Sequence, residues 1–158
     1  MRHEDVLAVL TGPVAQEILH PATTARIAYN GLDGFPRAIP IGVHFNGQKL
    51  IMCTTPKAEK VAALRKNPHV ALTIDTAQPV RSLLIRGTTS IEIVDGVPDE
   101  FLISATPEFE ATVRDLYDQM ARISIEVTWA KTIDFETNLP SAVEEIVRRK
   151  RPEMLSGD

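Results

Sequence analysis

Hydrophobic and polar residues alternate along much of the middle of the chain, which is the period of a β-strand. Six segments are expected to be strands: residues 23–29, 36–45, 49–54, 69–75, 81–94 and 122–131. Asn46-Gly47 is a strong signal for a hairpin between the second and third strands. Asn30 to Gly34 is turn-forming sequence between the first and second. We therefore expect the first three strands to form an antiparallel meander, and the fifth to bend at Gly87.

The remaining segments have the spacing of amphipathic helices. They are residues 3–11, 14–19, 56–66, 98–120 and 141–151. Within residues 98–120, Thr106 is a capping residue and Pro107 suits a first helical position. The helix over 98–120 is therefore expected to break at Thr106. In the last helix, the hydrophobic residues Val143, Ile146 and Val147 are expected to face inward.

Consecutive strands joined by hairpins favour an antiparallel sheet over a parallel βαβ sheet. Six strands of about six residues each suit a small closed barrel. The predicted fold is therefore mainly β with helices (α+β), a six-stranded antiparallel β-barrel with peripheral helices. One domain is expected over 1–158, with N-terminal helices in 1–20 and a C-terminal helix in 139–151.

The composition narrows the choice of partners. The chain has 158 residues, 44% of them hydrophobic and 24% charged, with a net charge of −4. An acidic balance does not favour nucleic acid or an anionic membrane as a partner. The start of the chain lacks the basic-then-apolar pattern of a signal peptide, and no apolar run is long enough to span a bilayer. One cysteine excludes an internal disulfide, so a cytoplasmic protein is expected.

The segment from Thr54 to Lys60 carries the clearest chemical signal. Thr55 is a good N-cap and Pro56 fits the first helical position, which predicts a helix from about residue 56. Lys57 and Lys60 would then oppose the positive end of the helix dipole. A bound anion would explain their placement, because backbone N–H groups, hydroxyls and lysines together form a phosphate site. The alternative is that both lysines simply face solvent.

Arg26 favours the anion site, because it lies inside an apolar strand where an arginine is seldom buried without a partner. Cys53 is expected to be a small buried hydrophobic residue rather than a redox group. The histidines have no metal-ligand spacing, so no metal site is expected. Trp129 and Tyr29 are core residues or neighbours of a planar ligand; the sequence leaves both interpretations open.

The order and spacing of several short segments resemble the pyridoxamine 5′-phosphate oxidase-like family of flavin-binding split β-barrels. The similarity covers roughly residues 5–135 and is strongest over 23–75. The segments are Arg26-Ile27-Ala28, Asp33-Gly34-Phe35-Pro36, Asn46-Gly47-Gln48-Lys49-Leu50, Thr54 with Lys60, and Asn67-Pro68-His69-Val70-Ala71-Leu72.

The resemblance implies a six-stranded split barrel and a homodimer with two FMN sites at the subunit interface. Arg26 and Lys60 would hold the FMN phosphate, with Lys57 and Thr55 beside it. Other contacts would come from Ile27, Ala28, Cys53 and Thr54, largely through backbone atoms. Ser82 would reach the flavin from the partner chain. Apart from the resemblance, Trp129 is a candidate to flank the flavin because of its place at the end of the last strand.

Two departures separate the chain from vitamin B6 oxidases. Glu59 stands where those enzymes usually have an arginine, and their terminal Arg-x-His motif is absent.

The leading hypothesis is therefore an FMN-dependent oxidoreductase that transfers a hydride through flavin N5 to or from an unidentified small molecule, with no catalytic side chain assigned. The alternatives are an F420-dependent reductase of the same fold, a non-catalytic flavin carrier or sensor, and a barrel without a cofactor; some branches of the superfamily bind haem.

Overall fold

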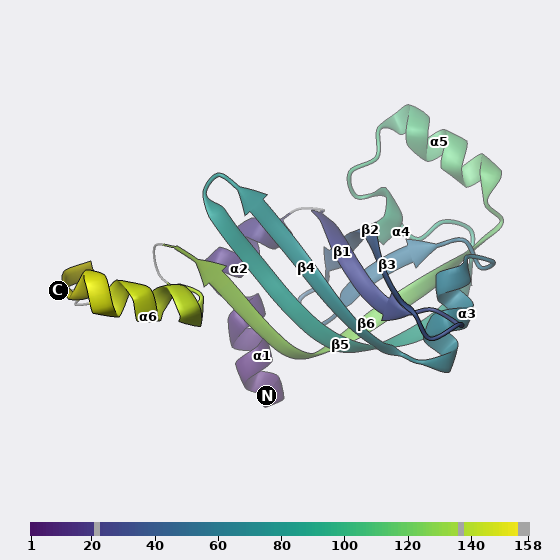
Figure 1. Ribbon diagram of the computed structural model, residues 1–158. Coiled ribbons are helices and arrows are strands. Elements are labelled where there is room, and N and C mark those ends of the chain that lie inside the picture. The colour runs from purple at the N-terminus through teal and green to yellow at the C-terminus, as the bar shows by residue number, and fades with distance from the viewer. Residues whose placement is uncertain (21–22, 136–137, 155–158) are drawn as a thin grey trace.

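Six antiparallel strands close into a barrel in the order β1-β2-β3-β6-β5-β4 (Figure 1). The computed structural model describes residues 1–20, 23–135 and 138–154. The strands are β1 (Thr23–Asn30), β2 (Pro36–Phe45), β3 (Leu50–Thr54), β4 (His69–Ala77), β5 (Val80–Asp95) and β6 (Gln119–Asp134). The predicted fold class and the predicted meander of the first three strands are confirmed.

Alternation of side chains across each strand builds the barrel core. In β1, Ala25, Ile27 and Tyr29 are buried while their neighbours are exposed. Equivalent inward residues of the other strands complete one cluster that includes Leu50, Leu72, Leu83 and Ile123. Burial of such side chains gives roughly 1.5–3 kcal/mol each, which makes this cluster the main source of stability.

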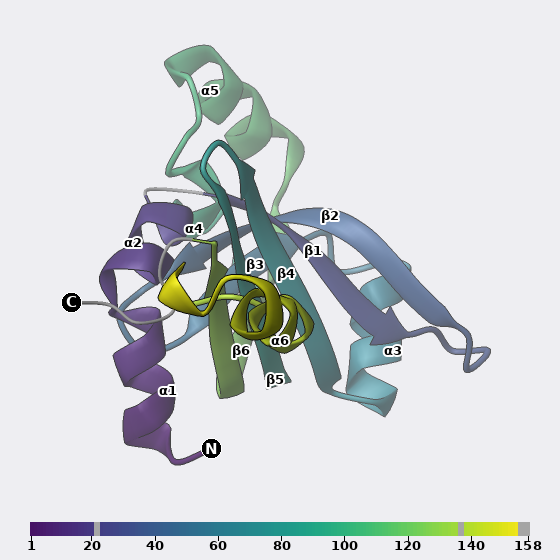
Figure 2. The ribbon, with the colours of Figure 1, turned by 60° about the vertical axis from the view of Figure 1, so that its left-hand side comes forward.

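Two helices close one end of the barrel and one helix closes the other (Figures 1 and 2). The first pair is α1 (His3–Leu10), which packs on β6, and α2 (Pro13–Leu19), which packs on β4 and β5. At the opposite end, α3 (Glu59–Lys66) buries Val61, Ala63 and Leu64. It packs against β1 and β5, which fixes the start of α3 beside the end of β3.

A helical excursion between β5 and β6 covers part of the outer surface. It contains α4 (Asp99–Leu102) and α5 (Pro107–Leu116), and the predicted break at Thr106 is confirmed, since its hydroxyl accepts a hydrogen bond from the Phe109 N–H at 3.2 Å. Beneath it lies a second hydrophobic cluster outside the barrel, formed by Ile51, Cys53, Val97, Val113 and Met120. The outer face of β3 is therefore buried as well as the inner face.

The start of α3 differs from the prediction. The helix begins at Glu59, and its N-cap is Ala58 with no side-chain cap, so Thr55 does not cap it. Instead the Thr55 carbonyl accepts a hydrogen bond from the Ala58 N–H at 3.1 Å, which makes residues 55–58 a turn. Proline suits the second position of a turn as well as the start of a helix, and here the turn is formed.

The C-terminal part of the chain also differs. Residues 119 and 120 begin β6 instead of ending a helix. Helix α6 (Ser141–Lys150) has no buried residue, and it extends away from the barrel beyond the end of β6 (Figure 1). The expectation that Val143, Ile146 and Val147 face inward is wrong for this chain alone, because Ile146 is 54% exposed and the two valines are only half-buried. A 3₁₀ turn, Pro152–Met154, follows.

The described part of the chain has no helix with the length and hydropathy needed to cross a membrane.

Candidate functional site

Lys60 occupies the second position of α3 and lies beside the last residue of β3. Its Nζ is 3.4 Å from the Thr54 hydroxyl oxygen, and both side chains are half-buried. Within the described ranges, no carboxylate lies at ion-pair distance from this ammonium. A partly buried cation at the positive end of a helix, next to a hydroxyl and to free N–H groups, is a suitable place for an anion.

Glu59, the residue before Lys60, forms an ion pair with Arg37 of β2. Its carboxylate accepts a hydrogen bond from Arg37 at 3.3 Å, and Arg37 also donates to Asp33 at 2.9 Å. The Arg37 hydrogen bond lowers the pKa of Asp33, so that carboxylate stays ionised. Because Glu59 is engaged by the β1–β2 turn, it does not neutralise Lys60.

Arg26 is exposed on the outer face of β1. It pairs with Pro40 of β2 on one side and Thr73 of β4 on the other. In the described residues it has no ion-pair partner. The β2–β3 pairs are His44 with Ile51 and Phe45 with Leu50 only, so no pairing connects Pro40 to the end of β3.

In the barrel order, β2 separates the strand that carries Arg26 from β3. Within the described chain, no hydrogen bond or ion pair joins it to Lys60. The structure thus brings Lys60 and Thr54 together and leaves Arg26 on the outer surface of β1, which is separated from β3 by β2.

The other predicted site residues are divided between two regions. Ile27 is 1% exposed and Tyr29 is 7% exposed in the barrel core, so only their backbone atoms could meet a ligand outside. Ala28 is exposed beside Arg26, Thr55 is half-buried, and Lys57 is exposed in the turn before α3.

Ser82 and Trp129 lie on β5 and β6. Although β6 is the neighbour of β3, Thr54 pairs with Ala121, so Trp129 and Ile133, the partner of Ser82, lie much farther along β6. The Trp129 ring packs against the Arg86 guanidinium at 4.5 Å.

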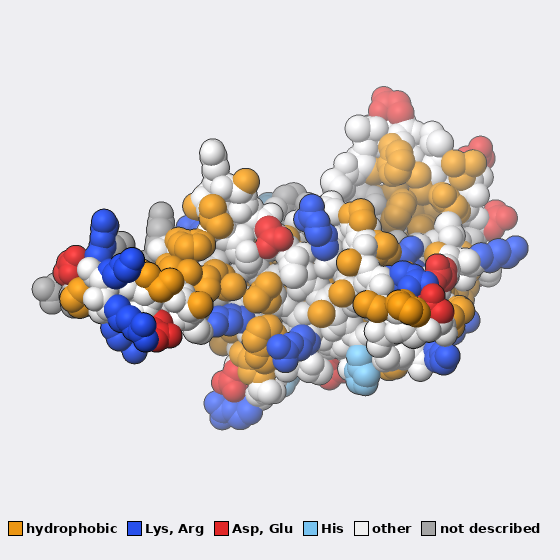
Figure 3. Space-filling view, in the orientation of Figure 1, with side chains coloured by type: hydrophobic (Ala, Val, Ile, Leu, Met, Phe, Trp, Pro, Cys, Tyr) orange, Lys and Arg blue, Asp and Glu red, His pale blue; other side chains and the backbone are white. Residues whose placement is uncertain are grey.

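Strand register places two rows of outward residues across five strands. One row is Pro40, Arg26, Thr73, Leu84 and Lys131, and the next is Ala38, Ala28, Ala71, Arg86 and Trp129. Directly opposite residues share a face of the sheet. We call these ten residues the outer sheet face. It carries small side chains at its centre and cations near its edges, and the view over β1, β4 and β5 shows basic side chains around a mainly uncharged surface (Figure 3).

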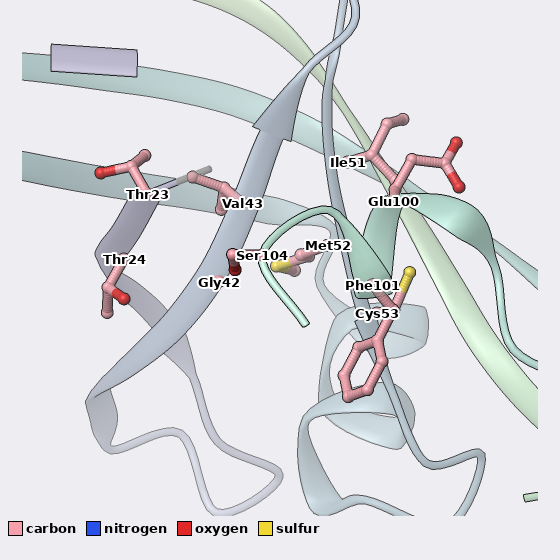
Figure 4. A pocket seen from close by; sticks show the side chains of 10 residues that line it. All are labelled: Thr23, Thr24, Gly42, Val43, Ile51, Met52, Cys53, Glu100, Phe101 and Ser104. Carbon is pink, nitrogen blue, oxygen red and sulfur yellow. The ribbon is translucent and has the colours of Figure 1, made fainter. Parts of the chain in front are cut away.

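A pocket of about 150 Å³ opens where the β2–β3 ladder stops (Figure 4). Four elements line it: Thr23 and Thr24 from β1, Gly42 and Val43 from β2, Ile51, Met52 and Cys53 from β3, and Glu100, Phe101 and Ser104 from α4 and the following turn. This pocket was not predicted from the sequence. The only signal was the uninterrupted apolar run from Leu50 to Cys53, which is typical of a strand covered on both faces.

Charges near the pocket are balanced. Glu100 accepts hydrogen bonds from the Arg122 Nε at 3.1 Å and from a second guanidinium nitrogen at 2.5 Å, and these bonds lower the pKa of Glu100. Burial, and then the nearby Glu100 charge, raise the pKa of the Cys53 thiol to about 11. The thiol is therefore neutral at pH 7 and is a poor nucleophile.

The described residues contain no group of three or more histidine, cysteine or acidic side chains able to hold a metal ion.

Solved structures with this fold include proteins of several kinds. An F420 reductase has a TM-score of 0.56 and 21% identity, covering 73% of this chain and 94% of its own. The haem storage protein HutZ from Vibrio cholerae has a TM-score of 0.58 and 13% identity, covering 80% and 95%. An FAD-binding protein from Mesorhizobium loti has a TM-score of 0.53 and 16% identity, covering 74% and 87%. At these identities the likeness shows a shared fold.

A comparison with curated proteins gave no match. The sequence profile of the pyridoxamine 5′-phosphate oxidase family, in contrast, matches residues 12–133, which include the whole of the barrel except its last residue, Asp134. The matched region contains Arg26, Thr54 and Lys60. The chain therefore belongs to the pyridoxamine 5′-phosphate oxidase family.

Proposed function

We propose that this protein binds FMN and is a flavin-dependent oxidoreductase. The observation that carries the proposal is the half-buried Lys60 ammonium, which lies beside the Thr54 hydroxyl at the start of α3 and has no carboxylate partner among the described residues. Membership of the pyridoxamine 5′-phosphate oxidase family supports a flavin as the ligand. The anion would be the phosphate of FMN.

The residues present fit this ligand. Lys60 contributes a point charge, Arg26 can bind phosphate oxygens in a bidentate way, and the first N–H groups of α3 add hydrogen-bond donors. Ala28, next to Arg26 on the outer face, leaves room for a ligand against the sheet. Bound flavin supplies hydride or electron transfer at its ring, while the protein supplies binding and orientation. None of the described side chains is required as a general base for this chemistry.

We also propose that the protein is a homodimer, with each flavin held between two copies of the outer sheet face. Arg26, Ala28 and Ala71 are exposed on the outer sheet face of a single chain. One chain alone would therefore cover only one side of a flavin bound against that face. A second copy would add Ser82 and Trp129, which lie too far along β5 and β6 from Ala121, the partner of Thr54, to serve the Lys60 site of their own chain.

A cytoplasmic location is proposed on a narrower basis. Cys53, the one cysteine, is a buried free thiol, which suits a reducing compartment.

Visible absorption of the purified protein tests the cofactor. A yellow protein that releases FMN on denaturation would support the proposal. A colourless protein that binds F420 but not FMN would point to an F420-dependent reductase instead; the additional cation Lys57, exposed beside the site, and the fold shared with an F420 reductase favour that as the second candidate. Haem absorption would contradict both proposals. Reduction of the bound flavin by NAD(P)H in a stopped-flow experiment separates an enzyme from a non-catalytic carrier.

Replacement of the phosphate ligands tests the site. Loss of one charge-assisted contact costs about 1.5–3 kcal/mol, so Lys60→Ala and Arg26→Ala should each weaken FMN binding by roughly ten- to a hundredfold, as measured by fluorescence titration. Lys57→Ala is the matched control, because it removes the same charge from an exposed turn, and it should change the affinity by less than about threefold. Unchanged affinity in both Lys60→Ala and Arg26→Ala would show that the phosphate binds elsewhere.

A further inference from the structure

The outer edge of β3 is incompletely paired, and this creates a second place for a ligand. Hydrogen-bonded pairs between β2 and β3 end at Ile51, although β3 continues to Thr54 along β6. Helix α4 and the turn after it lie over the gap and contact both β2 and β3. The pocket therefore has a sheet floor and a roof from the α4–α5 excursion (Figure 4).

The pocket is adjacent to the proposed flavin site along the chain. Thr24 and Gly42, which pair with each other, line it, and the next pair on the same outer face of β1 and β2 is Arg26 with Pro40. A ligand in the pocket would thus lie beside a flavin whose phosphate is bound by Arg26. This step rests on the proposed function.

The lining of the pocket selects for polar groups without charge. Glu100 is the only charged residue among those that line it, and the Arg122 guanidinium neutralises it from β6. The Cys53 thiol is directed toward Glu100 and stays protonated, since its pKa is about 11. Hydroxyl groups of Thr23, Thr24 and Ser104 supply donors and acceptors. A cation or an anion placed there would lack a free counter-charge, which is costly.

We propose that this pocket is the substrate subsite of the protein and that it takes a small, uncharged, hydroxyl- or carbonyl-bearing group. Its volume, about 150 Å³, suits one end of a substrate while the rest extends toward the flavin. The excursion that carries Glu100, Phe101 and Ser104 would then determine specificity.

Gly42 offers a direct way to fill the pocket. It lies on β2 in extended backbone, and a Cβ built on it meets no atom within 4 Å. Gly42→Leu would therefore occupy the cavity without a backbone clash. Ser90→Leu is the matched control, because it adds the same side chain at an exposed β5 position that does not line the pocket.

The test uses hydroxyacetone as the probe, with glycolate and ethanolamine as an anion and a cation of similar size. NMR spectra of the full-length protein should show hydroxyacetone shifting the amide signals of Gly42, Cys53 and Ser104, with the two ions binding at least about tenfold more weakly. Gly42→Leu should weaken hydroxyacetone binding at least about tenfold, equivalent to about 1.4 kcal/mol, while Ser90→Leu leaves it unchanged. FMN affinity, measured separately, should change less than about threefold in both variants.

Other outcomes would overturn the subsite. If hydroxyacetone shifts none of these signals in the unmodified protein, the pocket does not take the proposed group, whatever the variants do. Equal binding by all three probes would contradict the selection for neutral groups. If Gly42→Leu loses FMN as well, the pocket belongs to the flavin ring rather than to the substrate. Failure of the unmodified protein to bind any flavin overturns the proposed function itself and appears in the absorption spectrum, not in the probe shifts.

Discussion

Gly87 lies where β5 approaches β6 too closely for a side chain. A Cβ at this position would be 2.6 Å from the Glu126 carbonyl oxygen and 2.6 Å from the Ile125 Cγ2. The strand register shifts at the same place, between Arg86 and Gly87, which leaves Thr128 as an extra residue on β6. The predicted bend at Gly87 is thus a β-bulge that brings the two backbones together, and bulges of this kind re-aim the strand.

Gly87→Ala should therefore destabilise the protein. The added methyl group meets backbone as well as a side chain, and overpacking of this type costs about 1–3 kcal/mol. Urea unfolding followed by circular dichroism measures the change. Gly42→Ala is the control on another strand, because open space surrounds its Cβ, and it should leave stability within about 0.5 kcal/mol or raise it slightly. Equal stability of the two variants would mean that β5 and β6 separate easily at the bulge.

Single residues near α3 show how far sequence patterns reach. The proximity of Lys60 and Thr54 follows from a strand joined to a helix by a short turn, and the sequence predicted this proximity. The role of Glu59 did not follow, because its partner Arg37 lies on a different hairpin and only the closed barrel brings the two together. Whether a charge is free or paired depends on such long-range contacts, which residue spacing does not encode.

At the scale of elements, the α4–α5 excursion is attached to the barrel by a few specific contacts. Val97 and Val113 bury apolar surface in one cluster with Ile51 and Cys53 of β3 and Met120 of β6. The ion pair between Glu100 of α4 and Arg122 of β6 adds a charged link, and the two side chains are 24% and 25% exposed. Helix α4 has only four residues, so its position depends on these tertiary contacts rather than on helix propensity.

Glu100→Gln should loosen this link in a pH-dependent way. Hydrogen bonds from Arg122 lower the pKa of Glu100 below its ordinary value of 4.5, so the folded state binds the proton less readily than the unfolded state. The resulting stability is fully present above pH 4.5 and is lost as the pH falls through the lowered pKa. We expect the variant to be about 1–2 kcal/mol less stable at pH 7, with the difference shrinking below pH 4.5.

Thermal or urea unfolding at several pH values checks this. Glu110→Gln serves as the comparison, because Glu110 pairs with Arg114 within α5 and both side chains are more than 40% exposed. Such exposed pairs contribute about 0.3–0.5 kcal/mol. A Glu100→Gln effect that persists unchanged in acid would show that the residue acts through packing rather than charge.

Element boundaries differ in how well local sequence determines them. Strand period and turn residues predicted all six strands, because burial on one face repeats every second residue. The beginning of β6 was missed, since Gln119 and Met120 continue a helical spacing and their strand pairing with β5 is a long-range contact. The apolar stripe of α6 predicts a helix but does not say what covers it, and no other element of the described barrel does so.

At the scale of the whole molecule, the sequence predicted the barrel but not the use of its outer surface. Hairpin order determines which strands are neighbours, and closure follows from strand number. The α4–α5 excursion covers the outer face of β3 because of the path that the chain takes between β5 and β6. The spacing of hydrophobic residues does not predict that path. The outer sheet face, in contrast, could be identified only from the strand register, because its two rows join residues from five strands that are up to 105 positions apart, from Arg26 to Lys131.

The outer sheet face leads to a prediction about assembly. Ala71 lies at its centre on β4, exposed between Ala28 and Arg86. If two copies pack through this face, the protein should sediment at twice the 17.4 kDa mass of one chain. Ala71→Lys would place a charge and a long side chain between the copies and near Arg86, so it should shift the protein to a monomer at micromolar concentration, as measured by sedimentation velocity.

Flavin affinity then reports whether the second copy completes the site. The added lysine would by itself favour an anionic ligand, so a loss of FMN affinity of about tenfold or more in Ala71→Lys would come from the missing partner. Ala111→Lys, at an exposed position of α5 outside the outer sheet face, should remain dimeric and bind FMN normally. A monomeric Ala71→Lys that keeps full FMN affinity would show that one chain holds the flavin alone. An Ala71→Lys dimer would place the subunit contact on another surface, because a face closed against a second copy has no room for this side chain.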